Sequence, residues 1–349
     1  MSSSSNTTIT IALDAMGGDH GVESVIPGAA LCLEEQPDLK FMLFGDEAAI
    51  KAALSAHDAL ASASEIVHTD LYIKSDEKPS AALRASKGSS MRLAIEAVRD
   101  GKADAIVSAG NTGALMALAK MVLKTVPGIH RPAIASVWPT AKGSSVMLDL
   151  GANVLVDAEN LAQFAVLGAV FAKAHSPDVG VPSVGLLNVG TEDVKGPDHV
   201  RGAAEILSEV DFPGRYEGFV EGTDITKGTV DVIVCDGYAG NIALKTAEGV
   251  GKFFGDGLKA SLKSDPLTML GALLASFSLK RFKNKVDPRL YNGGVFLGLN
   301  GLCVKSHGGC DALAFSSAVK LSAELARHGY VETVTDDINN LISQESFLS

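Results

Sequence analysis

One local pattern recurs along the whole chain: a short apolar run, a polar loop rich in glycine, and then a stretch with helical spacing. At 181–207 an apolar strand (184–187) leads into a polar loop (188–196), and Pro197 stands where a helix begins. The unit returns at 9–34, 103–123, 145–173, 232–254 and 302–327. Strands that alternate with helices pair in parallel and are covered on both faces. The sequence therefore predicts an α/β fold with a mostly parallel sheet.

Composition narrows the class of protein. The chain has 349 residues and a formal net charge of −11, which allows a sizeable core and argues against nucleic acid as a partner. The four cysteines are scattered, as in a reduced cytoplasmic protein. Cys303, His307 and Cys310 lack an evident fourth ligand, so no metal site is expected. We expect a flexible tail at 1–8, one α/β catalytic domain at 9–335 and a C-terminal tail at 336–349.

The polar loops are the candidate binding elements, because ligands of open α/β folds lie at the carboxyl ends of the strands, where we expect one cleft. Asn111, Thr112 and Gly113 are predicted to lie at a helix N-terminus, which favours an anion such as phosphate. Neither the GxxxxGK[ST] loop nor GxGxxG is present, so no nucleotide cofactor is indicated. The candidate cations for phosphate are Arg84, Lys87, Lys195 and Lys245. Arg84 and Lys87 equally fit an ordinary solvated loop.

One segment, at 261–292, departs from the recurring pattern. An apolar helical face is predicted there, followed by basic residues. Such a segment, protruding at about 257–290, fits an anionic membrane surface or an acidic protein, and it fits a helix that packs in a dimer equally well. The apolar residues are Leu267, Leu270, Leu273, Leu274 and Phe277, and the basic ones are Lys280, Arg281, Lys283 and Lys285.

Taken together, the loop motifs resemble those of the PlsX family of bacterial phosphate acyltransferases. The matching stretches are DAMGGDH (14–20), KGSSM (87–91), SAGNTGALM (108–116), LDLGANV (148–154), LLNVGTEDVKG (186–196), DGYAGNIALKTAEG (236–249), YNGG (291–294) and KSHGGCD (305–311). The resemblance implies a three-layer α/β/α sandwich similar to isocitrate and isopropylmalate dehydrogenases, assembled as a homodimer. It implies transfer of a long-chain fatty acyl group from acyl carrier protein to inorganic phosphate, giving acyl phosphate for phospholipid synthesis.

The resemblance also implies a cellular setting. The chain is expected to be cytoplasmic and attached peripherally to the inner face of the bacterial membrane through 267–285. Its product is expected to serve a downstream glycerol-3-phosphate acyltransferase.

The implied reaction assigns roles to loop residues. An acyl thioester is already activated and phosphate is already a nucleophile, so no cofactor, metal or acyl-enzyme is required. Lys195 is one catalytic candidate. Asn188, Thr191 and Asn241 are further candidates, which are expected to stabilise the oxyanion that forms at the reacting carbonyl. His307 is expected to protonate the departing thiolate, although a loop histidine of this kind also fits a purely structural role. The carboxylates Asp14, Asp19, Glu192 and Asp193 are expected to orient the cations, since like charges repel phosphate.

Three alternatives remain open from the residues. The first is a metal- and NAD-dependent dehydrogenase on the same kind of fold, although its arginine cluster and paired aspartates do not stand out. The second is a phosphotransacetylase that acts on acyl-CoA. The third is a membrane-associated scaffold of lipid synthesis without catalytic activity.

Overall fold

A single eleven-stranded sheet organises the computed structural model, which describes residues 8–343 apart from the side chains at 79, 177, 283–286 and 341–342. The strands lie in the order β3-β2-β1-β4-β11-β10-β5-β6-β9-β7-β8. Their bounds are β1 Thr10–Asp14, β2 Lys40–Gly45, β3 Ser64–His68, β4 Ala105–Ser108, β5 Ala133–Thr140, β6 Gly143–Leu148, β7 Ser183–Leu187, β8 Arg215–Val220, β9 Val232–Val234, β10 Gly294–Leu297 and β11 Leu302–Lys305.

The predicted mostly parallel sheet is confirmed, and its exceptions lie in the middle. There β10 pairs antiparallel with β11 and β5, and β5 pairs antiparallel with β6, whereas the flanking pairs are parallel. β5 and β6 form a hairpin because only two residues, at 141–142, connect them. The sequence analysis did not recognise this hairpin, nor the strands β8 and β10.

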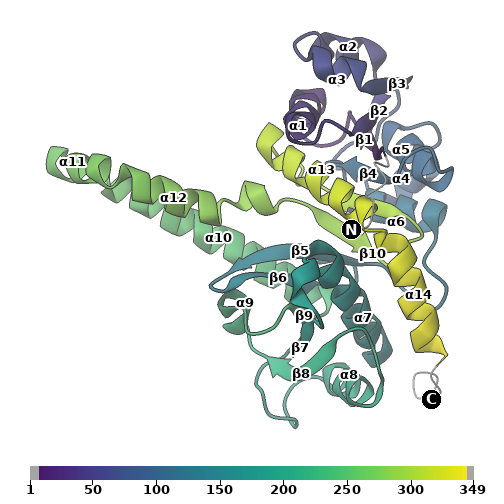
Figure 1. The fold of residues 1–349 in the computed structure, drawn as a ribbon, viewed down its shortest axis with the longest axis vertical. Helices are drawn as coiled ribbons and strands as arrows, with labels where there is room; N and C mark the ends of the chain where they lie inside the picture. The colour runs from purple at the N-terminus through teal and green to yellow at the C-terminus, as the bar shows by residue number, and fades with distance from the viewer. Residues whose placement is uncertain (1–7, 344–349) are drawn as a thin grey trace, which may run out of the picture.

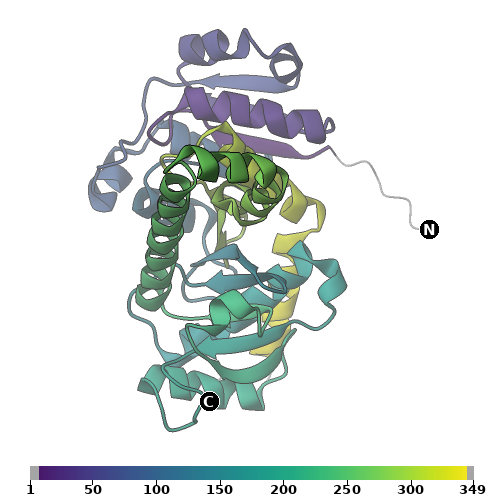
Figure 2. The same cartoon turned by 90° about the vertical axis from the view of Figure 1, so that its left-hand side faces the viewer.

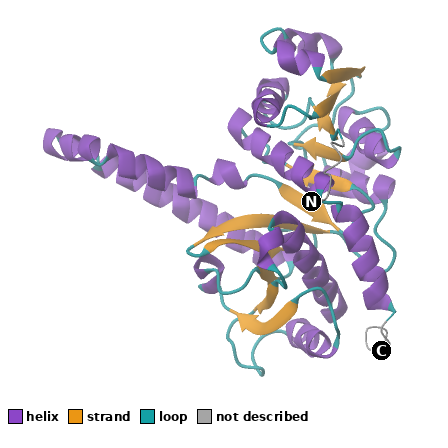
Figure 3. Ribbon diagram, in the orientation of Figure 1, coloured by secondary structure: helices purple, strands orange, loops and turns teal. Residues whose placement is uncertain are grey.

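Helices cover both faces of the sheet, as the recurring pattern predicted (Figure 3). α1 packs with α13, and α5 packs with α6. Successive residues of β1 enter different core clusters: Ile11 and Leu13 join one, and Ala12 joins the other. The helices are α1 Val22–Glu35, α2 Glu47–Leu54, α3 Asp58–Ser62, α4 Pro79–Ala85, α5 Ser90–Arg99, α6 Thr112–Leu123, α7 Ala158–His175, α8 Asp198–Glu209, α9 Asp224–Lys227, α10 Gly237–Ser261, α11 Pro266–Leu274, α12 Ser276–Val286, α13 Ala312–Arg327 and α14 Tyr330–Ile342. Pro177–Val179 and Pro288–Tyr291 form short 3-10 turns.

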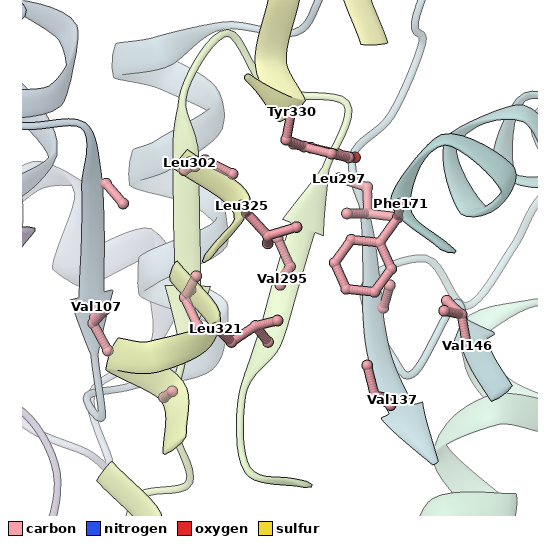
Figure 4. Close-up of a cluster of buried hydrophobic side chains, with 14 of the residues drawn as sticks. Val107, Val137, Val146, Phe171, Val295, Leu297, Leu302, Leu321, Leu325 and Tyr330 are labelled. Atoms are coloured by element: carbon pink, nitrogen blue, oxygen red, sulfur yellow. The ribbon is translucent and has the colours of Figure 1, made fainter. Parts of the chain in front are cut away.

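The core runs without interruption between the central strands and the helices that cover them. Val295 and Leu297 of β10 lie between Phe171 of α7 and Leu325 of α13 (Figure 4). Tyr330 stands edge-on to Phe171, with ring centres 6.0 Å apart. The last helix is therefore anchored to the same core as the middle of the chain.

This anchoring corrects the expected C-terminal tail at 336–349. α14 runs to Ile342, because Tyr330, Val334 and Ile338 recur every fourth residue and are buried. The C-terminal residues 344–349 and most of the expected N-terminal tail, 1–7, lie outside the described residues.

Helices α10, α11 and α12 project from the body as an arm (Figures 1 and 2). The expected single amphipathic helix is two helices, with Ala275 between them, so Phe277 does not continue the face of Leu267–Leu274. The arm also begins earlier than 257, because the outer part of α10 buries no side chain. No helix among the described residues is long and apolar enough to cross a membrane.

Candidate functional site

Three neighbouring strands end in one group of polar loops, which we call the first loop cluster: 14–20 after β1, 108–113 after β4, and 305–311 after β11. In the strand register Ser108 lies opposite Lys305, and Asp14 follows Leu13, whose partner Val107 precedes Ser108. Asp14, Ser108 and Lys305 therefore form a row across the ends of the three strands.

The buried carboxylate of Asp14 links the segments of this cluster through hydrogen bonds. Its carboxylate accepts hydrogen bonds from the Ser90 hydroxyl at 2.6 Å and the Ser108 hydroxyl at 2.7 Å. Ser108 Oγ in turn accepts the Gly110 N–H at 3.0 Å, so Asp14 fixes the loop that leads into α6. Burial raises the pKa of Asp14, and the serine hydrogen bonds oppose that rise. We expected Asp14 to orient a cation, and the structure gives its carboxylate two serine hydroxyls.

Glycines are required where these loops meet. A Cβ at Gly17 would lie 2.6 Å from Asp14 Oδ2 and 2.8 Å from the Gly110 nitrogen. A Cβ at Gly110 would lie 2.6 Å from the Met91 side chain. The glycines of DAMGGDH and SAGNTG therefore let two loops close over one buried carboxylate.

Asn111 begins α6, as predicted, and its polar atoms are already engaged. Its Oδ1 accepts the Ala114 N–H, and its Nδ2 donates to the carbonyls of Ser75 and Glu77. Within the described chain, the N–H groups of Thr112 and Gly113 have no acceptor, which is the usual state of a helix N-terminus. The helix end can thus offer two backbone donors to an anion, while Asn111 holds the segment that carries Arg84 and Lys87.

Arg84 and Lys87 are exposed. The segment that carries them includes the helix α4, which the sequence analysis did not anticipate. Ser89 caps α5 by accepting the Arg92 N–H.

His307 lies in the loop after β11 with a defined tautomer. Its Nδ1 accepts the Gly309 N–H at 3.2 Å, so the neutral ring carries its proton on Nε2. Asn292 of the YNGG motif accepts the His307 N–H and donates to the Ser306 hydroxyl. Asp19 joins the same loop through its N–H, which donates to the Gly308 carbonyl at 2.9 Å.

A second group of polar segments follows β6, β7 and β9, namely the loops 149–153 and 188–197 and the first turn of α10 with its cap at 236–241; we call it the second loop cluster. Its buried centre is Asp149, whose carboxylate accepts N–H groups from Ile134, Ala152 and Asn153. Burial raises the pKa of Asp149, and these hydrogen bonds oppose the rise. Gly240 contacts the same loop so closely that a Cβ there would lie 1.9 Å from the Asp149 carbonyl oxygen.

The loop after β7 is folded on itself. Asn188 Nδ2 donates to the Lys195 carbonyl at 3.0 Å, and Asn188 Oδ1 accepts the Val189 N–H at 2.9 Å. Lys195 Nζ lies 2.6 Å from Glu192, and both side chains are about half exposed. The hydrogen bond from Lys195 lowers the pKa of Glu192. The ion pair places Glu192 against Lys195, and the orienting role of this carboxylate in the reaction stays a prediction.

Thr191 and Asp193 are exposed on the same loop. Burial raises the pKa of Tyr216, and the negative charge of Asp193 raises it further, to about 12.

The glycine-rich segment 236–241 was expected to be a loop between a strand and a helix. That expectation is wrong, because α10 already begins at Gly237. Asp236 caps the helix by accepting the Ala239 N–H, which draws the glycines into its first turn. Asn241 therefore lies on a helix, with its side chain 3.5–3.7 Å from where a Gly151 Cβ would be. Lys245 lies a turn further along and pairs with Glu248 at 2.8 Å, so it does not reach back to the loop.

The predicted residues thus form two groups, and among the described residues no hydrogen bond or ion pair joins them. The three antiparallel pairs in the middle reverse the direction of the sheet between β11 and β6. The carboxyl ends of the strands in the two groups therefore do not lie at the same edge of the sheet. The single cleft that we expected stays a prediction. Five further residues of these two clusters were not predicted, although all of them lie within the sequence motifs quoted above: Ser90, Ser108, Asp149, Asn153 and Lys305.

One group of side chains has the composition of a metal site. Asp46, His68 and Asp70 bring one ligand atom each within 4.8 Å of one another near the ends of β2 and β3. His68 Nδ1 already accepts the Glu47 N–H, and Asp46 caps α2. These polar atoms of Asp46 and His68 therefore stabilise the local backbone. Cys303 and Cys310 are buried and free.

Comparison with known proteins gives a consistent result. The profile of a family described as "Fatty acid synthesis protein" matches residues 9–333. A phosphate acyltransferase from Parvibaculum lavamentivorans is 52% identical over 334 residues, covering 95% of this chain and 92% of the relative. One from Caulobacter vibrioides is 50% identical over 334 residues, covering 96% and 92%.

Among solved structures, a phosphotransacetylase from Streptococcus pyogenes superposes with a TM-score of 0.60 at 19% identity, covering 91% of this chain and 94% of that one. The EutD phosphotransacetylase from Staphylococcus aureus gives 0.59 with the same identity and coverage. At this identity the likeness concerns the fold alone.

Proposed function

Since this chain belongs to the fatty acid synthesis protein family and is a phosphate acyltransferase, which makes acyl phosphate for phospholipid synthesis, we propose that its donor is a long-chain acyl thioester of acyl carrier protein. The observation that carries the enzymatic assignment is the 50–52% identity to relatives of that name over 95–96% of the chain. Inorganic phosphate is the acceptor.

The mechanism that we propose is direct attack of phosphate on the thioester carbonyl. The two loop clusters are built for binding and orientation, which alone accelerate such a reaction greatly. In the first loop cluster Thr112 and Gly113 offer backbone N–H groups to phosphate, with Arg84 and Lys87 as cations. The proposal further requires that Lys195, in the second loop cluster, faces the same cleft; Lys245 is the weakest candidate because it pairs with Glu248. The four cysteines are buried, which supports a reaction without an acyl-cysteine.

The oxyanion that forms at the carbonyl requires donors. Asn241 Nδ2 and the Thr191 hydroxyl suit that role, whereas the Nδ2 of Asn188 already donates within its loop. Asn188 therefore serves the reaction by shaping the loop that carries Thr191 and Lys195. His307 protonates the leaving thiolate through Nε2, because Nδ1 accepts a backbone N–H.

The arm supports a further part of the proposal, namely that the enzyme is a cytoplasmic homodimer that docks on the inner face of the membrane. Leu273, Leu274 and Phe277 are 68%, 82% and 77% exposed. Such apolar side chains beside Lys280 and Arg281 suit an anionic surface, and the exposed length of α10 suits a second copy of the chain. Lys283 and Lys285 continue the basic sequence, but their side chains lie outside the described ones.

The decisive experiment combines purified protein, palmitoyl-acyl carrier protein and labelled inorganic phosphate. An acid-labile acyl phosphate that forms at the rate of thioester loss supports the proposal. The same assay with palmitoyl-CoA and acetyl-CoA tests the alternative that the donor is an acyl-CoA. Faster turnover of acetyl-CoA than of the carrier-protein thioester would contradict the proposed donor.

A further inference from the structure

Lys305, which the sequence analysis did not select, lies at the end of β11 in the first loop cluster. Its Nζ donates to the Ala109 carbonyl at 3.1 Å and to the Ser306 carbonyl, so it contacts two of the three loops. Among the described residues no carboxylate lies within 4.0 Å of it. An ammonium group has three N–H donors, so one of them is free for a ligand.

The cations that the sequence did suggest are placed differently. Lys195 and Lys245 each pair with a carboxylate of their own loop or helix, at 2.6 Å and 2.8 Å. Arg84 and Lys87 are exposed. Lys305 is half-buried, and a charge withdrawn from water attracts an anion more strongly than a solvated one does.

The charged and titratable groups around Lys305 come from three elements. Asp14 ends β1, Asp19 lies in the loop after it, Cys303 belongs to β11, and Cys310 lies in the loop after β11. Burial lowers the pKa of Lys305 to about 8, and these groups oppose the shift. The carboxylate of Asp14 is meanwhile occupied by Ser90 and Ser108, and the Lys305 ammonium contacts two backbone carbonyls and no carboxylate among the described residues.

We propose that Lys305 donates its third N–H to the phosphate that this enzyme acylates, beside the free backbone N–H groups of Thr112 and Gly113. The placement fits because Ala109, which Lys305 contacts, directly precedes the Gly110–Gly113 turn into α6. A dianion at this point neutralises the half-buried ammonium and fills the open donors of the helix end. The inference rests on the proposed function, since phosphate is the ligand.

The test compares three variants with the wild-type enzyme at a saturating acyl donor. Lys305→Gln removes the charge, Lys305→Arg keeps it, and Lys320→Gln is the matched control, because Lys320 is also partly buried but pairs with Glu35 between α13 and α1. We expect Lys305→Gln to raise the KM for phosphate at least tenfold, with a smaller effect on kcat. Lys305→Arg should restore most of the loss, and Lys320→Gln should behave as wild type. Isothermal titration with inorganic phosphate alone should give the same order of affinities.

The pH profile separates a phosphate ligand from a residue that only holds two loops together. The wild-type KM for phosphate should rise as the pH passes about 8, because Lys305 loses its proton there while phosphate stays a dianion. In Lys305→Arg the rise should disappear, since guanidinium stays charged throughout that range. Equal pH dependence in both proteins overturns the inference.

The outcomes distinguish this inference from the proposed function. A wild-type enzyme that forms no acyl phosphate from any thioester contradicts the function. An active enzyme whose Lys305→Gln variant keeps the wild-type phosphate KM contradicts the inference alone. If circular dichroism shows that Lys305→Gln is unfolded, the pH profile of Lys305→Arg gives the answer.

Discussion

Two buried aspartates show how single residues shape the site. Asp14 and Asp149 both lie at the carboxyl end of a strand, and both accept hydrogen bonds from hydroxyl or N–H groups of neighbouring strands, helices and loops. A buried carboxylate requires such donors, because removing them leaves a desolvated charge that costs about 1–3 kcal/mol or more. These carboxylates therefore fix the loops that they contact, at 108–113 and 149–153, whereas the half-exposed Lys195 lies on a loop held by Asn188.

Replacing Lys195 by Ala should leave the fold intact and impair the reaction. The side chain is about half exposed and its ion pair with Glu192 is a surface one, so its removal should change stability only slightly. Losing a charge-assisted contact to phosphate should raise the phosphate KM or lower kcat by about tenfold or more. Lys227→Ala is a matched control, because Lys227 also pairs with a carboxylate three residues away. Normal kinetics in folded Lys195→Ala would remove Lys195 from the site.

Replacing all four cysteines by Ala or Ser should leave phosphate-dependent acyl transfer largely intact. Burial raises the pKa of Cys32 to about 12 and also raises those of Cys235 and Cys303, so these side chains stay as unreactive thiols. Some loss of thermal stability is expected from packing. Mass spectrometry during turnover provides the check, and a stoichiometric acyl-cysteine would overturn direct attack.

At the scale of elements, the arm differs from the rest of the fold. Helices of the body bury one face on the sheet, whereas α11 buries no residue among those described. Phe253 and Phe254 of α10 are 74% and 68% exposed, with ring centres 5.7 Å apart. Exposed apolar surface on this scale marks a contact with a membrane or with another chain.

Reversing the charges of Lys280, Arg281, Lys283 and Lys285 to Glu should abolish binding to anionic vesicles. Each cation near such a surface contributes about 1 kcal/mol, so four contribute several. The matched control reverses four exposed lysines outside the arm, namely Lys40, Lys51, Lys102 and Lys142. Leu273→Glu with Leu274→Glu should also impair vesicle co-sedimentation while turnover in solution persists. If that variant becomes monomeric and the charge variant still binds vesicles, the arm is a packing element and the membrane proposal is wrong.

The elements were largely predictable because their signals are local. The unit predicted at 302–327 ends at the last residue of α13, since a capping Asp311 precedes that helix and a buried apolar face fills it. β10 was missed because four residues between two glycine-rich stretches carry no periodicity. The start of α10 was missed because its first turn contains two glycines, which are typical of a loop. In the structure these glycines pack closely against Asn153 and Asp149.

For the whole molecule, sequence reasoning identified the loops but not their grouping. The pairing of β11 with β4 brings Lys305 next to Ser108 and Asp14. No local sequence pattern predicts that pairing. The reversal of strand direction at β10 and β6 also depends on pairings between distant segments. Motif membership indicated which residues matter, and the topology decides which of them meet.

The homodimer can be tested on the intact molecule. Phe253→Glu with Phe254→Glu should convert it to a monomer in sedimentation velocity, because a symmetric interface would lose four rings, each worth about 1.5–3 kcal/mol when buried. The fold should persist, since both rings are largely exposed and neither is part of the buried core. The control variant Met121→Glu with Val181→Glu changes exposed apolar residues outside the arm and should stay dimeric. A wild-type monomer at micromolar concentration would contradict the proposal.

The position of β11 between β4 and β10 has a consequence for how the chain is made. Ala109 and Lys305 are 196 residues apart, and β4 has an unpaired edge until the ribosome has released the segment that fills it. At about 5–20 residues per second, synthesis of that interval takes about 10–40 s. During this time the first half of the sheet presents an open strand edge to every other nascent chain, a known hazard for aggregation. A chain released before residue 302 would lack the strand that closes this gap, so truncated translation products of this protein cannot assemble the first loop cluster.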